Sequence, residues 1–378
     1  MFNFLNDKSI FLLFIIFLLT LSYHKDVTEI LEVNKCPLCF GVKFCTQFEV
    51  GKIKIWNSNV LLKIILLIKY IFSLSFVVFC KWNDTDVVIK QFDYYSSDIE
   101  EISISKTNTR DELEVSIIQD MKSFLNIPFN SSFSPNIRLC PTTENLEVLL
   151  ESIYSFRKDN VNLLQNIRYM IHTNPEPFIQ QVLKAENGWP VPKHYGSCGR
   201  VTVSENCGEM LTNCVKDDWD SRKHLALQLL DSALNFTFNH PHFAFYFTDI
   251  TPDNIAVTTS GEVKFIDLDN VIIVERSTTA DLPAWTVPHS SEDIECDNCF
   301  AFSSDAICSH HYSDHNVYAV CREILNQKSH LIDGGLLHST PPEFLEKHPD
   351  FIDSLEQCVS PRTSDRFHHA KKLMKILS

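Results

Sequence analysis

Residues 247–254 read Phe-Thr-Asp-Ile-Thr-Pro-Asp-Asn, and after a Ser-Gly turn the chain continues with Val-Lys-Phe-Ile-Asp up to position 267. Asp249 lies five residues before Asn254 and eighteen before Asp267. A loop, a strand and a turn of this length can bring a carboxylate, an amide and a second carboxylate together around metal-bound phosphates. Surface loops are rich in Asp and Asn anyway, so the informative feature is the second carboxylate, at this interval and at the end of an apolar strand.

This spacing resembles the catalytic segment of protein kinases. There one Asp orients the nucleophilic hydroxyl, an Asn holds one metal ion, and a later Asp holds the metal ions that bridge the phosphates. The resemblance implies that Asp249 is catalytic, that Asn254 and Asp267 bind metal and nucleotide, and that Asp269 is an auxiliary metal ligand. The implied cofactor is ATP with Mg or Mn.

A lysine in the first half completes this pattern. Lys90 ends Val-Val-Ile-Lys, which resembles the kinase strand whose lysine neutralises the phosphates during transfer, so it is predicted to be both catalytic and nucleotide-binding. That lysine pairs with a Glu on the next helix. We predict Glu112, with Glu114 as the rival, and a helical insertion at about 123–185 leaves a later Glu open.

The segment 200–209 resembles the strand and hinge that join the two kinase lobes. Hinge backbone groups bind the adenine edge, and a polar residue nearby reaches the ribose. Glu205, Cys207 and Glu209 are therefore predicted to bind nucleotide. An ordinary strand and turn at Gly208 would give the same pattern.

Two residues of the second half resemble structural residues of kinases. Asp314 resembles the buried Asp that braces the catalytic loop, and Arg366 resembles the arginine of the closing helices. A clear amphipathic helix is expected over 219–236, with Asp217 or Asp218 as its cap.

The chain has 378 residues, a net charge of −15 and 13 cysteines. The acidic balance argues against nucleic acid as a partner, because phosphate binding needs clustered Lys and Arg. So many cysteines favour an oxidising compartment and disulfides, although the two pairs Cys36-x-x-Cys39 and Cys296-x-x-Cys299 could instead form a zinc site. The spacing does not fix which cysteines pair.

Two apolar runs bear on the membrane. Residues 1–23 are expected to be a signal peptide or a signal anchor, two alternatives that the sequence leaves open. Residues 60–79 favour paired buried strands over a membrane span, because Lys63 and Lys69 interrupt the run. Glycosylation sequons occur at three positions, Asn83, Asn130 and Asn235.

The chain from Lys35 onward resembles the divergent protein kinase domain family, in the branch of the Deleted-in-Autism-1 protein. The segments that carry the resemblance are Lys35-Cys-Pro-Leu-Cys-Phe-Gly, Asn174-Pro-Glu-Pro, Gly188-Trp-Pro, Tyr195-Gly-Ser-Cys-Gly-Arg, Phe245 to Asn254, Asp314-His-Asn-Val-Tyr-Ala-Val-Cys and Gly334-Gly-Leu-Leu-His. The resemblance implies a protein of the secretory pathway, in the Golgi or secreted. The expected partner is then an unknown lumenal or extracellular protein. Contact with a membrane is expected only through the N-terminal leader, if it stays uncleaved.

The expected fold class is α+β, a two-lobed protein-kinase-like fold preceded by the leader. A cysteine-rich segment is expected over 24–51. A β-rich first lobe over 52–210 carries the helical insertion, and a mainly helical second lobe covers 211–378.

Several departures from working kinases leave the activity open. Phe247 and Thr248 replace His-Arg, Thr251 replaces the catalytic-loop lysine, and Asp267-Leu-Asp269 replaces Asp-Phe-Gly. No G-x-G-x-x-G precedes the strand lysine. One interpretation is a lumenal or secreted enzyme that transfers the γ-phosphate of ATP to a protein. The alternative is an inactive pseudokinase that acts as a secreted ligand or as a scaffold in the Golgi.

Overall fold

The computed structural model describes residues 31–55, 75–92, 109–129, 135–153, 161–276, 300–362 and 365–378. These residues belong to two compact units. Unit 1 comprises the chain up to Ile117, Arg157–Pro177 and Lys193–Asn206, and unit 2 comprises Ile118–Phe156, Phe178–Pro192 and Cys207–Ser378. The predicted leader at 1–23, most of the apolar run at 60–79, and Asn130 lie outside the described residues.

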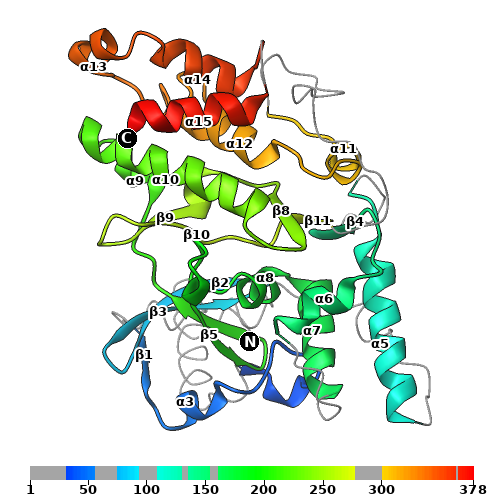
Figure 1. Ribbon diagram of the computed structural model, residues 1–378. Coiled ribbons are helices and arrows are strands. Elements are labelled where there is room, and N and C mark those ends of the chain that lie inside the picture. Colours follow the sequence, from blue (N-terminus) through cyan, green and yellow to red (C-terminus); the bar gives the residue numbers. More distant parts are fainter. Residues whose placement is uncertain are drawn as a thin grey trace, which may run out of the picture. The chain divides into compact units, whose positions relative to one another are not determined.

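Unit 1 is built on one antiparallel sheet of five strands in the order β1-β2-β3-β6-β5 (Figure 1). The strands are β1 (Ile53–Ile55), β2 (Phe76–Trp82), β3 (Thr85–Gln91), β5 (His194–Cys198) and β6 (Val201–Glu205). Residues alternate between buried and exposed along β2, with Phe76 and Val78 inside and Val77 and Phe79 outside. This period of two confirms the strand prediction for the end of the second apolar run.

Helices of unit 1 precede and follow the central strands. The cysteine-rich segment forms η1 (Val33–Lys35) and α3 (Cys45–Glu49), and the later part of the chain forms α7 (Val161–Thr173). Two further helices, α5 (Arg110–Leu125) and α8 (Glu176–Val182), begin in unit 1 and end in unit 2. The expected helical insertion, at about 123–185, is therefore divided between the two units instead of lying wholly in the first.

Unit 2 contains two small sheets, each of three strands. The first has the order β10-β9-β7 and consists of β7 (Glu209–Met210), β9 (Ile255–Val257) and β10 (Val263–Phe265). The second has the order β4-β11-β8 and consists of β4 (Ile137–Cys140), β8 (Phe243–Phe247) and β11 (Val271–Glu275). Strand β4 runs parallel to β11, and β8 runs antiparallel to it.

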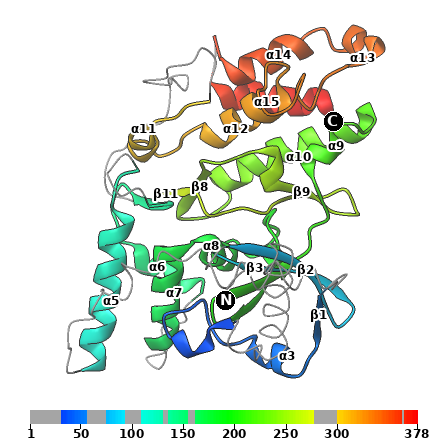
Figure 2. The same cartoon turned by 180° about the vertical axis from the view of Figure 1, so that it is seen from behind.

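The rest of unit 2 is mainly helical, as predicted, and Figure 2 shows α10, α12, α14 and α15 packed as a group. Its helices are α6 (Leu146–Glu151), η2 (Ala185–Asn187), α9 (Leu211–Cys214), α10 (Trp219–Phe238), η3 (Pro252–Asn254), α11 (Ser304–Cys308), α12 (His315–Ala319), η4 (Val320–Leu325), α13 (Pro342–Lys347), α14 (Phe351–Val359) and α15 (Arg366–Leu377). The prediction of α10 is confirmed, and Asp218 is its cap, accepting a hydrogen bond from the Ser221 backbone amide.

Four disulfides lie within the described residues. Unit 1 contains Cys36–Cys39 and Cys45–Cys198, and unit 2 contains Cys140–Cys308 and Cys321–Cys358. The disulfide interpretation is therefore confirmed for these cysteines, and the alternative of a zinc site is wrong for the first of the two Cys-x-x-Cys pairs. The second pair, Cys296-x-x-Cys299, lies outside the described residues.

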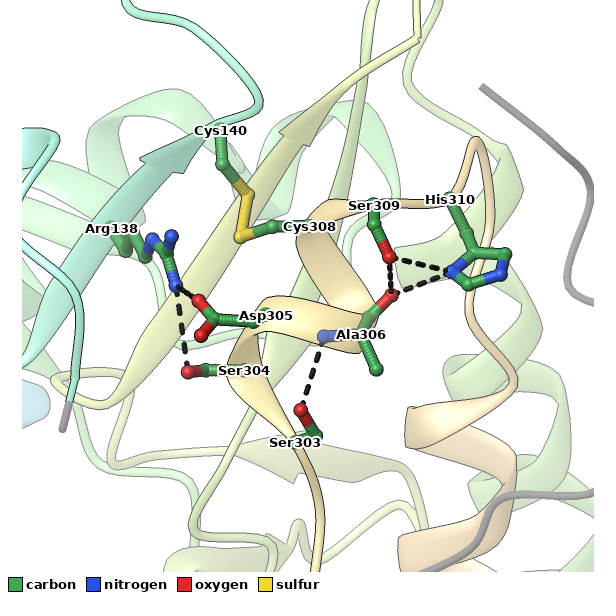
Figure 3. The surroundings of a disulfide bond; sticks show 9 residues. All are labelled: Arg138, Cys140, Ser303, Ser304, Asp305, Ala306, Cys308, Ser309 and His310. Carbon is green, nitrogen blue, oxygen red and sulfur yellow. Dashed lines mark hydrogen bonds and ion pairs between the residues drawn. A yellow bond between two sulfur atoms is a disulfide. The ribbon is translucent and has the colours of Figure 1, made fainter.

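The Cys140–Cys308 disulfide joins the end of β4 to α11 (Figure 3). Beside it, the guanidinium of Arg138 lies 2.7 Å from the carboxylate of Asp305, so the strand and the helix are linked twice. Among the described helices, none combines the length and the hydropathy that a membrane span requires.

Candidate functional site

Unit 1 places Lys90 on β3 and pairs it with a buried glutamate. The Lys90 Nζ lies 2.8 Å from both carboxylate oxygens of Glu176. The side chains are 16% and 2% exposed. Glu176 begins α8, and its backbone amide donates to the side chain of Asn174, which fixes the glutamate to the preceding turn. A buried carboxylate is stable only when paired, so this ion pair sets the position of the lysine.

The prediction that Glu112 pairs with Lys90 is wrong, and its rival Glu114 is not the partner either. Glu112 lies in the first turn of α5, where its carboxylate accepts from the Thr109 amide and its own amide donates to the Thr109 hydroxyl. This reciprocal pair is a capping box, which a Thr followed by a Glu three residues later already signals. The true partner lies in the segment Asn174-Pro-Glu-Pro, which the chain reaches only after two more helices.

Unit 2 places Asp249 and Asn254 in direct contact. The Asn254 side-chain amide donates to the Asp249 carboxylate at 3.0 Å and to the Asp249 backbone carbonyl at 3.1 Å. These two hydrogen bonds close residues 249–254 into a compact loop. The amide that would hold a metal ion and the predicted catalytic carboxylate are oriented by one another.

Two backbone hydrogen bonds bring the second carboxylate to this loop. The Thr248 amide donates to the Asn270 carbonyl, and the Ile266 amide donates to the Asn254 carbonyl, both at 3.0 Å. The segment that carries Asp249 therefore runs alongside the segment that carries Asp267. This arrangement agrees with the prediction from spacing.

The electrostatics of Asp249 show that the carboxylates interact. Partial burial raises the pKa of the Asp249 carboxyl above its ordinary value, the hydrogen bond from Asn254 lowers that pKa, and the negative charge of Asp267 raises it. A divalent cation between two such carboxylates would relieve their repulsion. Carboxylate oxygens with an amide oxygen are also the hard ligands that Mg²⁺ and Mn²⁺ prefer, so these residues fit the cofactor.

Asp269 lies two residues further along. Its carboxylate accepts a hydrogen bond of 2.6 Å from the Asn270 side chain. Within the described ranges, no three His, Cys, Asp or Glu side chains cluster as they would to hold a metal ion alone. A metal at this site would therefore depend on the Asn254 amide and on the phosphates of a nucleotide for part of its coordination.

An aromatic side chain of α10 packs against the segments that carry Asp249 and Asp267. The ring of Phe236, on α10, lies 4.8 Å from that of Phe247 and 5.2 Å from that of Phe265. These two rings lie two residues before Asp249 and Asp267, respectively. Phe247, which stands in place of a kinase histidine, is therefore a core residue.

The loop is also braced by the start of α12, but not by the residue that the sequence suggested. Asn316 accepts from the Phe247 amide at 3.2 Å, and the His315 Nε2 lies 2.9 Å from the Phe247 carbonyl, to which it donates. Asp314 instead forms a buried ion pair with Arg366. The residues that brace the loop are thus His315 and Asn316, one and two positions after Asp314.

The predicted hinge residues are divided between the two units. Glu205 ends β6 in unit 1, where its carboxylate accepts from the Lys193 amide at 3.1 Å. In unit 2, Cys207 is buried and Glu209 is exposed on β7. Gly208 has a φ of +92°, and a Cβ there would lie 2.4 Å from the Val257 carbonyl, so β7 can approach β9 this closely only with a glycine.

Sequence reasoning missed two polar residues that support the acidic loops. Gln228, on α10, donates to the Gly261 carbonyl at 2.7 Å and accepts from the Val263 amide at 3.0 Å, which fixes the turn between β9 and β10. The Thr212 hydroxyl donates to the carboxylate of Asp253, inside the loop. No local pattern marks either residue, because both contacts join segments that are distant in sequence.

The comparisons with known proteins agree with this geometry. The sequence model of the protein-kinase domain of FAM69 matches residues 168–361, which include Glu176 and the acidic loops. Divergent protein kinase domain 2A of Xenopus tropicalis is 28% identical over 383 residues, covering 92% of this chain and 87% of that protein. The human protein of the same name is 27% identical over 376 residues with the same coverage.

A solved structure of vaccinia related kinase 3 aligns with 80% of this chain and 82% of its own, at 11% identity and a TM-score of 0.34. The family match covers more than half of the chain, and it contains the predicted acidic set. The chain therefore belongs to the divergent protein kinases that share the protein-kinase domain of FAM69, and its fold is protein-kinase-like, with a β-rich first unit and a mainly helical second one.

Proposed function

We propose that this chain is a kinase-like protein of the secretory pathway that binds Mg- or Mn-ATP and transfers the γ-phosphate to a lumenal or secreted protein. The observation that carries the proposal is the bidentate contact between Lys90 and Glu176. An active kinase needs its strand lysine held by a helix glutamate, because the lysine must meet the phosphates at a fixed point.

Each acidic residue has a role in this proposal. Asp249 orients the acceptor hydroxyl and takes its proton, and Asn254 holds it in position through the 3.0 Å hydrogen bond. Asn254 and Asp267 would hold the metal ion, with Asp269 as an auxiliary ligand. A metal ion held by these residues would supply positive charge beside the phosphates and so lower the barrier to transfer.

Nucleotide contacts outside the phosphates are proposed for the hinge. The segment from Glu205 to Glu209 would bind the adenine edge through backbone groups, with Cys207 and Glu209 close to the base and the ribose. Glu205 also fixes the end of β6 through the Lys193 amide.

Four disulfides support the proposed compartment. Structural disulfides form and persist in oxidising surroundings such as the secretory lumen and the extracellular space. We therefore propose a location in the Golgi or outside the cell, reached through the leader at 1–23. The protein partner proposed for this location is lumenal or extracellular, and no nucleic acid is involved.

A pseudokinase acting as a secreted ligand or Golgi scaffold is the second candidate function. The observation that favours it is Thr251, which stands where kinases have the lysine that helps hold the transferred phosphate. In that case nucleotide binding, if retained, would only stabilise the fold. The two candidates differ in whether phosphate is transferred.

Calorimetric titration with ATP, with and without Mg or Mn, tests the proposal. We expect metal-dependent binding by the wild type and a loss of at least tenfold in affinity for Lys90→Met and for Asp267→Ala, about 1.4 kcal/mol or more. Two matched controls should bind like the wild type: Lys81→Met, an exposed lysine on the neighbouring strand, and Asp220→Asn, an exposed carboxylate on α10. A wild type that binds no nucleotide with either metal would refute the proposal.

A second measurement separates the two candidates. Asp249→Ala should retain nucleotide binding but lose phosphotransfer to proteins of a secretory lumen fraction, measured with labelled ATP. If the wild type binds ATP and transfers nothing, and Asp249→Ala keeps its biological activity, the pseudokinase function is the correct one.

A further inference from the structure

We propose that the disulfide-bonded N-terminal segment, residues 31–50, is a positioning element for the Lys90–Glu176 pair, and that it acts on α7 through Asn166. This inference rests on the proposed nucleotide-binding function. It adds a positioning part that lies outside the residues proposed to contact nucleotide. All of its residues belong to unit 1.

The first contact joins the disulfide loop to α7. The Asn166 side-chain amide donates to the Pro37 carbonyl at 2.8 Å and to the Cys39 carbonyl at 3.0 Å, and it lies 3.4 Å from the Cys39 sulfur. The Cys36–Cys39 disulfide closes the turn that contains both carbonyls. The turn therefore presents two acceptors to a single side chain of the helix, an arrangement that an open and mobile segment would not maintain.

The second contact joins the segment to α7 and to the residue that directly follows β3. The ring of Phe40 lies 5.2 Å from that of Tyr169, on α7, and 5.3 Å from that of Phe92, directly after β3. Lys90 lies two residues before Phe92. One residue of the segment thus packs against the helix that precedes the glutamate and against the residue that follows the strand of the lysine.

The segment is itself fixed to the sheet. The Phe40 amide donates to the Gly199 carbonyl at 2.8 Å, and the Gly199 amide donates to the Gly41 carbonyl at 2.7 Å. The Cys45–Cys198 disulfide adds a covalent link to β5. A Cβ at Gly199 would lie 1.7 Å from the Leu31 carbonyl, so the segment and the sheet meet at backbone contact distance.

Hydrogen bonds connect the C-terminal end of α7 to Glu176. The Asn174 amide donates to the Met170 carbonyl at 3.0 Å, and the Asn174 side chain accepts from the Glu176 amide at 2.9 Å. These residues are buried, so the turn between α7 and α8 has little room to move. A helix held at Asn166 therefore holds Glu176 against Lys90, and releasing that hold should allow the pair to separate.

Amide hydrogen exchange tests the proposal without nucleotide. Asn166→Ala, and separately Cys36→Ser with Cys39→Ser, should speed exchange of the Glu176 amide at least tenfold while leaving α10 unchanged. Asn162→Ala is the control on the same helix, because Asn162 is exposed. The double variant Cys321→Ser with Cys358→Ser, which removes a disulfide from unit 2, controls for general destabilisation and should leave this amide protected.

Nucleotide binding is the second readout. Asn166→Ala should weaken Mg-ATP binding about tenfold relative to Asn162→Ala. Unchanged exchange at Glu176 in Asn166→Ala and in the Cys36 and Cys39 variant would overturn the positioning role, whatever the affinity. If the wild type binds no Mg-ATP but the exchange of this amide responds as expected, the proposed function fails and the positioning element stands.

Discussion

Single charges determine how the acidic loop titrates. Asp249 has a raised pKa because burial disfavours its charged form and because Asp267 lies close, while the hydrogen bond from Asn254 acts in the opposite direction. The carboxylate must be charged to orient a hydroxyl or to accept its proton. The protonation state of Asp249 therefore depends on both neighbours, and a bound cation would favour its charged form.

The pKa of Asp249 should move in opposite directions in two variants. Asp267→Asn removes a negative charge and should lower the pKa toward its ordinary value, whereas Asn254→Ala removes a hydrogen bond to the charged form and should raise it further. Carboxyl carbon NMR titration of metal-free protein measures both shifts. Shifts of the same sign in the two variants would contradict this account.

The ion pair of unit 1 should be more sensitive to the loss of one partner than of both. Lys90→Met removes a bidentate counter-charge from the buried Glu176 and should lower the free energy of unfolding by about 3 kcal/mol. Adding Glu176→Gln should recover most of that loss. Urea unfolding followed by fluorescence tests this, and an equal loss in the single and double variants would show that the carboxylate does not need its partner.

The sequons at Asn83 and Asn235 should differ in use if the chain passes through the secretory pathway. Asn83 is exposed in the turn between β2 and β3, with a φ of +53°. Asn235 donates to Asp231 on α10, and the hydroxyl of its sequon partner Thr237 is buried and donates to a backbone carbonyl. A glycan therefore fits the first site and not the second.

Enzymatic deglycosylation of secreted protein checks this prediction. The mass shift should disappear in Asn83→Gln and persist in Asn235→Gln, measured with Asn130→Gln as background because that sequon lies outside the described residues. A shift that survives Asn83→Gln and is lost in Asn235→Gln would show the opposite preference.

At the scale of helices and strands, backbone contact distances limit substitution. Gly208 and Gly188 both have left-handed φ values, of +92° and +84°. A Cβ at Gly188 meets nothing within 4 Å, whereas a Cβ at Gly208 would collide with β9. The two glycines therefore separate the effect of φ from the effect of close approach.

Gly188→Ala should cost about 1–2 kcal/mol of unfolding free energy from its φ alone. Gly208→Ala should cost about 1–3 kcal/mol more, because β7 must move away from β9. Chemical denaturation of the two variants measures the difference. Equal losses would mean that the strands can separate without penalty.

Local patterns predicted the elements better than their partners. The period of α10 and its Asp cap are properties of one short stretch, and they appear where the sequence placed them. The spacing from Asp249 to Asp267 also predicted that their two segments run side by side, because a loop and a hairpin close on themselves. The partner of Lys90 could not be found this way, because Glu176 is brought to it by tertiary packing over 86 positions.

At the scale of the whole molecule, covalent links connect distant parts of each unit. The Cys140–Cys308 disulfide closes a loop of 168 residues in unit 2. The cysteine content pointed to a class of compartment, but no cysteine pairing could be read from spacing. Pairing depends on which segments become neighbours in the folded chain.

Cys140→Ser with Cys308→Ser should destabilise unit 2 by up to about 5 kcal/mol, because the unfolded chain regains the entropy of the open loop. Exchange of β11 amides should rise, while exchange of β3 amides in unit 1 should stay at the wild-type level. The same experiment on Cys321→Ser with Cys358→Ser, whose loop has 37 residues, should give about 1 kcal/mol less. An equal rise in both units would indicate that they unfold as one.

The parallel pairing of β4 with β11 has a consequence for biosynthesis. Residue 137 lies beside residue 271, so a ribosome delivers the first of these strands long before its neighbour exists. During that interval the edge of β4 has no hydrogen-bonding partner strand, and the thiol of Cys140 has no native disulfide partner. Both can then pair with the wrong segment. Chains truncated ahead of position 271 should therefore accumulate as disulfide-linked aggregates, and a chaperone with a disulfide isomerase should reduce that accumulation.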